Sequence, residues 1–291
     1  MHFITLDTLP PEALVAAFND AFGVYAVKVE MTPARLENVI RARSILLERS
    51  YGLLEADRLA AFILTGSRRI DARLVAYNAA TGVCRDHQRK GLGRRLLTHT
   101  MARLQTFGYQ SYRLEVITTN TGARRLYLEQ GFAEGRLLHS YTAKAGELTA
   151  AGERLPASGA AVVTSVDHNW ADRMAVLRSH TPSWQNAEPA VDAIAPHCRI
   201  VTTGPAAAPT AMAVLDPRFG VLHQFGFAPG DTEAARRVVA RAMEHTGAGA
   251  LHLINVDSCL LYTSPSPRDL VGTRGCRLML EKKGGGGGGG G

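Results

Sequence analysis

The apolar residues of the first half of the chain recur with two periods, which predict helices and strands. Within residues 91–107, Leu96, Leu97 and Leu104 share one face at helical spacing, so a helix is expected there. Within residues 111–119, apolar and charged residues alternate, which predicts a half-buried strand. The same reasoning predicts further helices at 10–22, 32–50 and 120–130. It also predicts two strands around a turn at Asp57 within 51–66, and strands at 72–85 and 131–143.

This order of elements predicts the fold class. Two helices precede a β-meander, and strand, helix, strand, helix and strand follow it. Strands that alternate with helices are typical of an α/β fold, and the meander adds antiparallel strands to it. We therefore expect an α/β domain with a mixed sheet.

The second half of the chain repeats this order. A strand is expected at 160–167, a helix at 169–180, a meander over 199–227, a helix at 232–245 and a strand at 250–256. One local repeat supports the correspondence, because "RRLLTHTM" at 94–101 and "RRVVARAM" at 236–243 match at two arginines, two aliphatic residues and a methionine. The repeat predicts a second unit of the same fold.

The last 33 residues differ abruptly from the rest of the chain. They begin at Cys259 with "CLLYTSPSPRD" and end in eight glycines. This beginning resembles the conceptual translation of a transposase-type sequencing adapter, and the alternative is a natural Ser/Pro linker with a flexible glycine tail. We interpret 259–291 as a non-native tail, which leaves 28 basic and 24 acidic residues and a net charge of +4 instead of +7.

The composition excludes several classes of protein. With 291 residues, two domains are expected, and no apolar run is long enough for a membrane span. The four cysteines have neither metal-ligand spacing nor a dense disulfide pattern, and no secretory signal is recognisable, so a cytoplasmic location is expected. A net charge of +4 gives little support to nucleic-acid binding. We expect no membrane or nucleic-acid partner and no metal, and the oligomeric state stays open.

The stretch "HQRKGLGRRLL" at 87–97 carries the first candidate chemistry. It lacks the Lys and Ser/Thr of a P-loop, and Leu96 stands where a dinucleotide-binding fingerprint needs its third glycine. Gly91 and Gly93 nevertheless allow close approach of a ligand to the backbone at the expected start of a helix, where free N–H groups bind anions. From these residues alone, a phosphate site and a solvated basic turn remain equally open.

Two motifs in order resemble the GCN5-related N-acetyltransferase (GNAT) superfamily. The first is Gln/Arg-x-x-Gly-x-Gly/Ala, matched at 88–93. The second lies downstream at the spacing usual in that family, and Gly82 and Val83 before the loop also fit. The resemblance covers roughly residues 1–145, and the residues of the second motif are Asn120, Ala123, Leu126, Tyr127, Gly131 and Phe132.

The resemblance implies an acyl-CoA N-acyltransferase fold, in which two central strands splay apart to admit the pantetheine arm. It also implies acetyl-CoA as cosubstrate. By that resemblance, backbone groups of Val83 and Arg85 contact the pantetheine amides, the loop amides hold the pyrophosphate, and Asn120 contacts the cofactor arm. The implied cofactor-binding residues are Val83, Arg85, Gln88, Arg89, Lys90, Gly91, Leu92, Gly93, Arg94 and Asn120.

The implied reaction is direct attack of a primary amine on the acetyl carbonyl in a ternary complex. Tyr127 would protonate the departing thiolate, and its alternative role is packing beneath the sheet. Glu115 is the candidate base, and its alternative is a solvent-facing carboxylate. The acceptor is a small-molecule or peptide amine. A catalytically inactive CoA-binding sensor or scaffold of the same fold is the alternative function.

The expected organisation is a catalytic GNAT domain at 1–145, a linker at 146–159 and a second GNAT-like domain at 160–258. Superposing the two halves through their repeat places Glu233 at the position of Gly91 and Ala235 at that of Gly93. A carboxylate there would repel a pyrophosphate, so we expect the second domain to be degenerate. It should also be incomplete, because the tail replaces its last elements.

Overall fold

The computed structural model describes residues 1–23, 30–144, 161–257 and 272–284. The chain divides into two compact units, each described by itself below. The first unit comprises Met1–Gly135 together with Met279–Gly291, and the second comprises Arg136–Leu278. The expected linker at 146–159 lies outside the described residues, and the expected domain boundaries stay a prediction.

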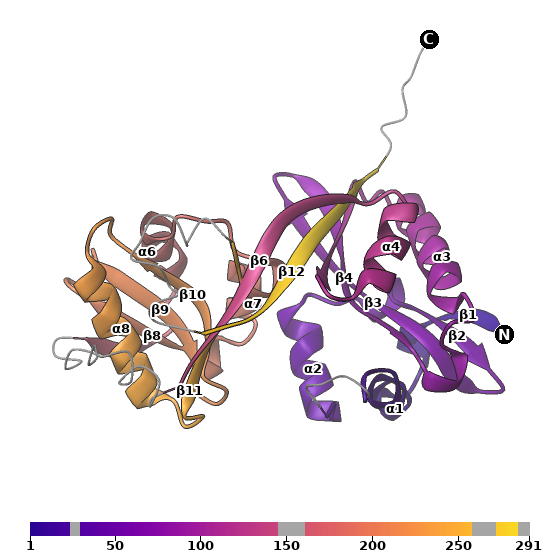
Figure 1. Ribbon diagram of the computed structural model, residues 1–291, viewed down its shortest axis with the longest axis horizontal. Helices are drawn as coiled ribbons and strands as arrows, with labels where there is room; N and C mark the ends of the chain where they lie inside the picture. Colours follow the sequence, from indigo (N-terminus) through magenta and orange to yellow (C-terminus); the bar gives the residue numbers. More distant parts are fainter. Residues whose placement is uncertain (24–29, 145–160, 258–271, 285–291) are drawn as a thin grey trace, which may run out of the picture. The chain divides into compact units, whose positions relative to one another are not determined.

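The first unit is an α/β layered structure (Figure 1). Its strands lie in the order β1-β2-β3-β4-β5, antiparallel up to β4 and parallel between β4 and β5. The helices α1 and α2 bury their apolar residues against β3 and β4 in one core. The elements are β1 (His2–Thr5), α1 (Pro11–Phe22), α2 (Pro33–Ala42), β2 (Tyr51–Glu55), β3 (Arg58–Ile70), β4 (Arg73–Val83), α3 (Leu92–Thr106), β5 (Ser111–Ile117) and α4 (Thr121–Glu129), with 3₁₀ turns at Leu6–Thr8, Leu47–Arg49 and Arg85–His87.

The expected single helix over 32–50 was wrong, because α2 ends at Ala42. Thr32 caps its start as expected, accepting a hydrogen bond from the backbone N–H of Arg35 at 3.2 Å. Ser44 then adopts a left-handed conformation with φ 52°, which no helix tolerates, and Ile45 bridges to Gly66 on β3. The apolar residues after Ala42 have helical spacing, but the chain leaves the helix there because Ile45 is buried in the core.

The central parallel strands of the first unit part at a defined point. β4 and β5 are paired from Val75 with Ser111 to Asn78 with Leu114, and both strands continue beyond that pair. A bulge between Leu64 and Thr65 on the neighbouring β3 lies beside the same point. The mixed sheet with splayed strands is therefore confirmed.

The second unit has the same architecture. Its strands lie in the order β6-β11-β10-β9-β8-β7, parallel only between β10 and β11. The apolar face of α8 packs on β8 to β11 in a core of its own. The elements are β6 (Ala133–Lys144), β7 (Val162–Ser165), α6 (Trp170–Leu177), α7 (Glu188–Asp192), β8 (Arg199–Thr203), β9 (Ala211–Asp216), β10 (Val221–Phe227), α8 (Thr232–His245) and β11 (Ala250–Asp257), with 3₁₀ turns at Trp184–Asn186 and Ala195–His197.

The outer edge of β11 is covered by β6. The two strands pair antiparallel from Ala250 with Lys144 to Asp257 with Leu138. β6 follows α4 directly in the sequence, yet its residues from Arg136 onward belong to the second unit. The strand that closes this edge of the second unit is therefore the unit's own N-terminal segment, which precedes β11 by more than 100 residues.

The C-terminal strand β12 (Gly272–Lys283) contacts the first unit through its last residues. The N–H of Gly284 donates to the carbonyl of Gln110 at 2.7 Å, and Glu281 pairs with Arg113 on β5 at 3.0 Å. Lys282 donates to the carbonyl of Gln130 at the end of α4, at 2.6 Å. These residues lie in the segment interpreted as a non-native tail, and that interpretation stays a prediction.

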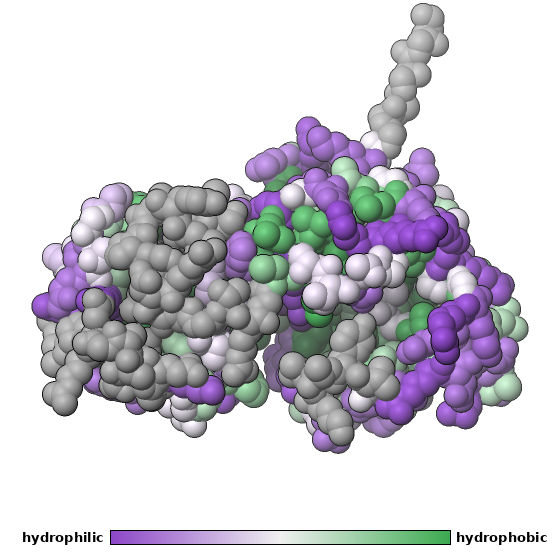
Figure 2. Space-filling model, viewed as in Figure 1, coloured by the Kyte–Doolittle hydropathy of each residue, from purple (hydrophilic) through white to green (hydrophobic). Residues whose placement is uncertain are grey.

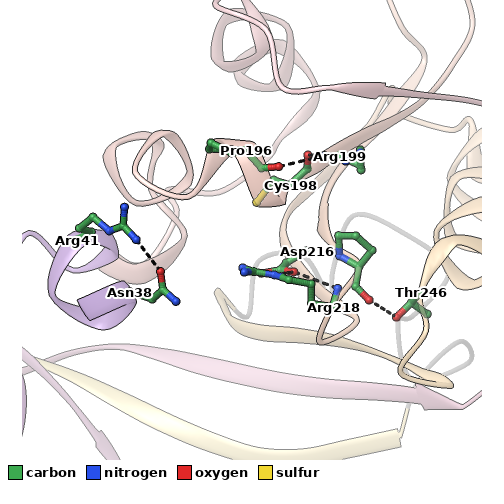
Figure 3. A network of polar contacts seen from close by, with 9 residues as sticks. Asn38, Arg41, Pro196, Cys198, Arg199, Asp216, Arg218 and Thr246 are labelled. Carbon is green, nitrogen blue, oxygen red and sulfur yellow. Dashed lines mark hydrogen bonds and ion pairs between the residues drawn. The ribbon is translucent and has the colours of Figure 1, made fainter. Parts of the chain in front are cut away.

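A half-buried histidine, whose ring nitrogens are shielded from solvent, makes the stability of the second unit depend on pH. Among the described residues, neither ring nitrogen of His223 on β10 has a hydrogen-bond partner, and both are shielded from solvent. Burial lowers its pKa to about 4, and Arg218 opposes its charging while Asp216 favours it. Figure 3 shows these two residues joined, with Arg218 donating to Asp216 at 2.7 Å.

The stability of the second unit should therefore fall as the pH drops from about 6.5 to 4. In that window the unfolded chain binds a proton at His223 that the folded chain excludes, so its contribution is complete above pH 6.5 and lost toward pH 4. His223→Phe should remove up to about 3 kcal/mol of this dependence, measured by urea unfolding across the range. The exposed His168→Phe is the control. A pH profile of His223→Phe parallel to that of the natural chain would contradict the assignment.

Candidate functional site

The segment between β4 and α3 is anchored on two sides of the first unit. The backbone N–H of Arg85 donates to the carboxylate of Asp20 on α1 at 2.8 Å. The ring of His87 bonds to Glu55, at the end of β2, at 2.7 Å. This hydrogen bond is the main reason why the pKa of Glu55 lies below its ordinary value. The two anchors fix the path of the chain toward the start of α3.

The start of α3 is open to an anion. Gly91 occupies the N-cap in a left-handed conformation, φ 77°, and no side chain caps the helix. A Cβ at Gly91 would meet nothing within 4 Å. The first helical bond runs from Arg95 N–H to the Gly91 carbonyl at 3.1 Å, so the amides of the first turn point out of the helix. Uncapped amides and the helix dipole together favour a negatively charged ligand.

Gly93 brings this helix close to the end of β4. A Cβ at Gly93 would lie 3.8 Å from Val83 and 3.7 Å from Leu126 of α4, at ordinary contact distance. The carbonyl of Val83 accepts a hydrogen bond from the side chain of Gln88 at 3.1 Å. The structure thus brings Val83, Gln88 and Gly93 together where β4 leaves β5.

The basic side chains around the loop are mostly exposed. Arg89, in a left-handed conformation with φ 60°, and Lys90 are both exposed. Arg94 pairs with Glu129 of α4, which also pairs with Arg125, and the hydrogen bonds from Arg125 and then Arg94 lower the pKa of Glu129. Figure 2 shows hydrophilic residues interspersed with hydrophobic ones over α3 and α4. Positive charge is therefore available around the amides of Gly91 to Arg94.

The second motif forms α4. Asn120 is its N-cap, and its side-chain oxygen accepts from the N–H of Ala123 at 3.1 Å. Tyr127 is only 7% exposed and meets the edge of the Phe132 ring at 5.7 Å between centroids. Phe132 also packs against Tyr112, at 5.6 Å, and burial raises the pKa of that phenol. The Tyr127 side chain is therefore held by an aromatic cluster.

Glu115, the strand residue proposed as the base, lies at the splay. Glu115 is half-buried and follows Leu114, the last residue of β5 that pairs with β4. On the other strand, Asn78 donates to Thr81 at 2.8 Å.

Among the residues that anchor the site, sequence reasoning missed Asp20, Glu55 and Thr81. The contacts of Asp20 and Glu55 join segments 65 and 32 residues apart, so no local pattern signals them.

Residues 15–132 match the model of the acetyltransferase (GNAT) family. The match contains the loop, the splay and the Tyr127 cluster. Residues 15–132 belong to the GNAT family. The resemblance inferred from the two motifs is therefore confirmed, and members of this family use acetyl-CoA as a general rule.

Curated relatives match the same region of the GNAT domain. The [ribosomal protein bS18]-alanine N-acetyltransferase of Salmonella typhimurium is 41% identical over 85 residues, which are 29% of this chain and 55% of that protein. The enzyme of the same name from Escherichia coli K12 is 36% identical over 92 residues, 32% of this chain and 60% of that protein. The chain thus spans less than two thirds of these relatives.

Solved structures share the fold of the whole chain. A tandem GNAT protein from the clavulanic acid biosynthesis pathway has a TM-score of 0.67 at 10% identity, over 98% of this chain and 99% of that one. A GCN5-related N-acetyltransferase from Sphaerobacter thermophilus has a TM-score of 0.66 at 12% identity, over 97% and 95%. The prediction of a GNAT fold in two tandem units is therefore confirmed.

Across the described parts of the chain, no helix is both long and apolar enough to cross a membrane. The predictions that no metal takes part and that the protein is cytoplasmic stay predictions.

A carboxylate at the start of α3 should repel the phosphates of acetyl-CoA. Gly91→Asp places one there without a steric clash, because the site of its Cβ is open. Gly91→Asn is the matched neutral control, since Asn and Asp both tolerate the left-handed conformation. We expect Gly91→Asp to bind acetyl-CoA at least tenfold more weakly than Gly91→Asn, about 1.4 kcal/mol, by calorimetric titration. Equal affinities of the two variants would show that the α3 amides do not hold the phosphates.

Proposed function

We propose that the first unit is an acetyl-CoA-dependent N-acetyltransferase that transfers the acetyl group to a primary amine. The observation that carries the proposal is the uncapped start of α3 at Gly91, which lies beside the parting of β4 and β5. An open anion site next to parted strands suits a ligand with a charged phosphate end and a thin amide-bearing arm. Both the open space at Gly91 and the ordinary contact distance at Gly93 fit such a ligand.

In the proposed complex, the amides of residues 88–94 hold the pyrophosphate. The arm of the cofactor lies between the parted strands, against Val83 and the start of α4 at Asn120. The N–H of Arg85 already donates to Asp20, and the carbonyl of Val83 already accepts from Gln88. A pantetheine contact at the N–H of Arg85 therefore requires the loop to exchange an internal hydrogen bond for an external one. The carbonyl of Val83 has a second lone pair and can accept a further hydrogen bond without such an exchange.

The proposed chemistry is a direct transfer. The neutral amine attacks the acetyl carbonyl, a C–N bond forms and the C–S bond breaks. Glu115, or a water path that ends at it, takes the proton that the amine loses, and Tyr127 supplies a proton to the departing thiolate. A phenol has an ordinary pKa of about 10, so it is protonated at neutral pH and able to donate.

The acceptor class follows from the relatives. Two of them are named for acetylating the alanine of a ribosomal protein. We therefore propose a peptide α-amine as the first acceptor to be examined, with small primary amines beside it. Release of CoA thiol from acetyl-CoA in the presence of each amine measures the reaction, and a full chain that neither binds acetyl-CoA nor releases thiol would refute the proposed function.

Loss of the Tyr127 hydroxyl should slow turnover but spare cofactor binding. We expect Tyr127→Phe to lower kcat on the best acceptor of the panel by about 10²-fold or more, with the Kd for acetyl-CoA within threefold of the natural chain. Tyr109→Phe is the control, because Tyr109 donates to Ser67 away from α4. Full turnover in Tyr127→Phe would exclude Tyr127 as the acid. Tight acetyl-CoA binding by the natural chain without turnover on any amine would favour the sensor or scaffold function.

A further inference from the structure

The second unit has the same two features that form the candidate site of the first. Its parallel strands β10 and β11 pair only at Val221 with His252 and Leu222 with Leu253, and then part. A bulge in β11 follows Leu253, and Asn255 within it has φ 56°. The helix after β10, α8, begins at Thr232, as α3 follows β4 in the first unit. The second unit thus has its own splay and its own helix start.

One residue bridges the parted strands of the second unit. The backbone carbonyl of Asn186 accepts a hydrogen bond from the side chain of Gln224 on β10 at 2.7 Å. The side-chain amide of Asn186 donates to the backbone carbonyl of Ile254 on β11 at 2.5 Å. Asn186 is 3% exposed and Gln224 is 2% exposed. An amide from the chain itself therefore lies where the strands no longer bond to each other.

The segment that carries Asn186 is fixed on β10 by close packing. Gly226 lies against the backbone at the end of α6, where a Cβ would come within 2.7 Å of Leu177. Arg178 donates to Gln224 at 3.0 Å and pairs with Glu188. Residues 177–188, which we call the strap, are thus fixed at both ends.

Arg136 of β6 holds the middle of the strap. Its guanidinium donates to the carbonyls of Thr181 at 2.5 Å and Pro182 at 3.1 Å. The same group pairs with Asp257 at the end of β11, at 3.1 Å. The strap is therefore tied to the strand next to the splay as well as to β10.

The start of α8 is closed by a carboxylate. Asp231 is the N-cap, and its side chain accepts from the N–H of Ala234 at 3.0 Å. Glu233 adds a second carboxylate in the first turn and pairs with Arg237 at 3.1 Å. At the corresponding start of α3, Gly91 offers no side chain at all. A phosphate at α8 would have to displace one carboxylate and approach another.

We propose that the second unit carries built-in substitutes for both parts of an acyl-CoA. The Asp231 carboxylate occupies the anion position at the helix start, and the Asn186 amide occupies the position of the pantetheine amides between the strands. The second unit is therefore a closed site that takes no acyl-CoA, and the chain binds one acetyl-CoA, in the first unit. The stoichiometry of one rests on the proposed function, whereas closure of the second unit does not.

Calorimetric titration of the full chain with acetyl-CoA tests the stoichiometry. We expect one site per chain, and that site should bind at least tenfold more weakly in Gly91→Asp. Two sites, or a full site that survives in Gly91→Asp and in Gly93→Glu, would overturn the proposal. No binding by the natural chain would refute the proposed function of the first unit and agree with a closed second unit.

Hydrogen exchange on the same samples locates the effect of the ligand. Acetyl-CoA at millimolar concentration should protect amides around 83–95 and leave those of the strap, of 224–236 and of 252–256 unchanged. Added protection in these second-unit segments would overturn the proposal, whatever the stoichiometry.

Removing the side-chain amide of Asn186 tests directly whether this group holds the parted strands β10 and β11 together. Asn186→Ala should raise the exchange rates of amides in 222–226 and 252–256 at least tenfold, because the two strands lose the group that joins them. Asn169→Ala is the matched control, since Asn169 is exposed and its side chain caps no helix. Unchanged exchange in Asn186→Ala would show that the Asn186 amide does not hold the two strands together. It would then overturn the proposal that this amide takes the place of the pantetheine amides.

Discussion

Each unit of this protein depends on the parting of two adjacent parallel strands. Strands that separate leave backbone N–H and C=O groups without ladder partners, and buried backbone groups need other partners. In the first unit, β4 and β5 part after Asn78 and Leu114, next to an open helix start. In the second, β10 and β11 part after Leu222 and Leu253, and a side chain fills the gap. One backbone constraint is thus met in two ways.

The loop of the first unit is positioned from outside its own motif. Asp20 on α1 holds the N–H of Arg85, and Glu55 at the end of β2 holds His87. These contacts come from two separate elements of the N-terminal half of the unit and meet at one short segment. The glycines make a ligand approach possible, but the anchors decide where the amides point.

The sequence allowed the GNAT fold and the loop to be predicted, because both rest on local patterns. The glycines at 91 and 93 and the second motif at 120–132 are short, ordered signals, and the helices at α1, α3, α4 and α8 have clear periodicity. The end of α2 could not be read, since it is decided by burial of Ile45. Nor could Asn186 or Asp20 be found, because each acts on a strand or loop distant in sequence. Among the residues that close the second unit, the helix cap at Asp231 could have been found from a local pattern. It lies two residues before Glu233, which the repeat aligns with Gly91.

The placement of β6 has a consequence for how the chain is made. β6 pairs with β11, and roughly 110 residues separate the two strands in the sequence. At the usual synthesis rate of about 5–20 residues per second, β6 leaves the ribosome roughly 5–20 seconds before its partner exists. During that interval the strand presents unpaired backbone groups and the apolar side chains of Leu138 and Tyr141. The nascent chain therefore passes through a state in which the edge of β6 is exposed and unpaired. At this stage the chain is most prone to aggregate, and binding of a chaperone would protect it most.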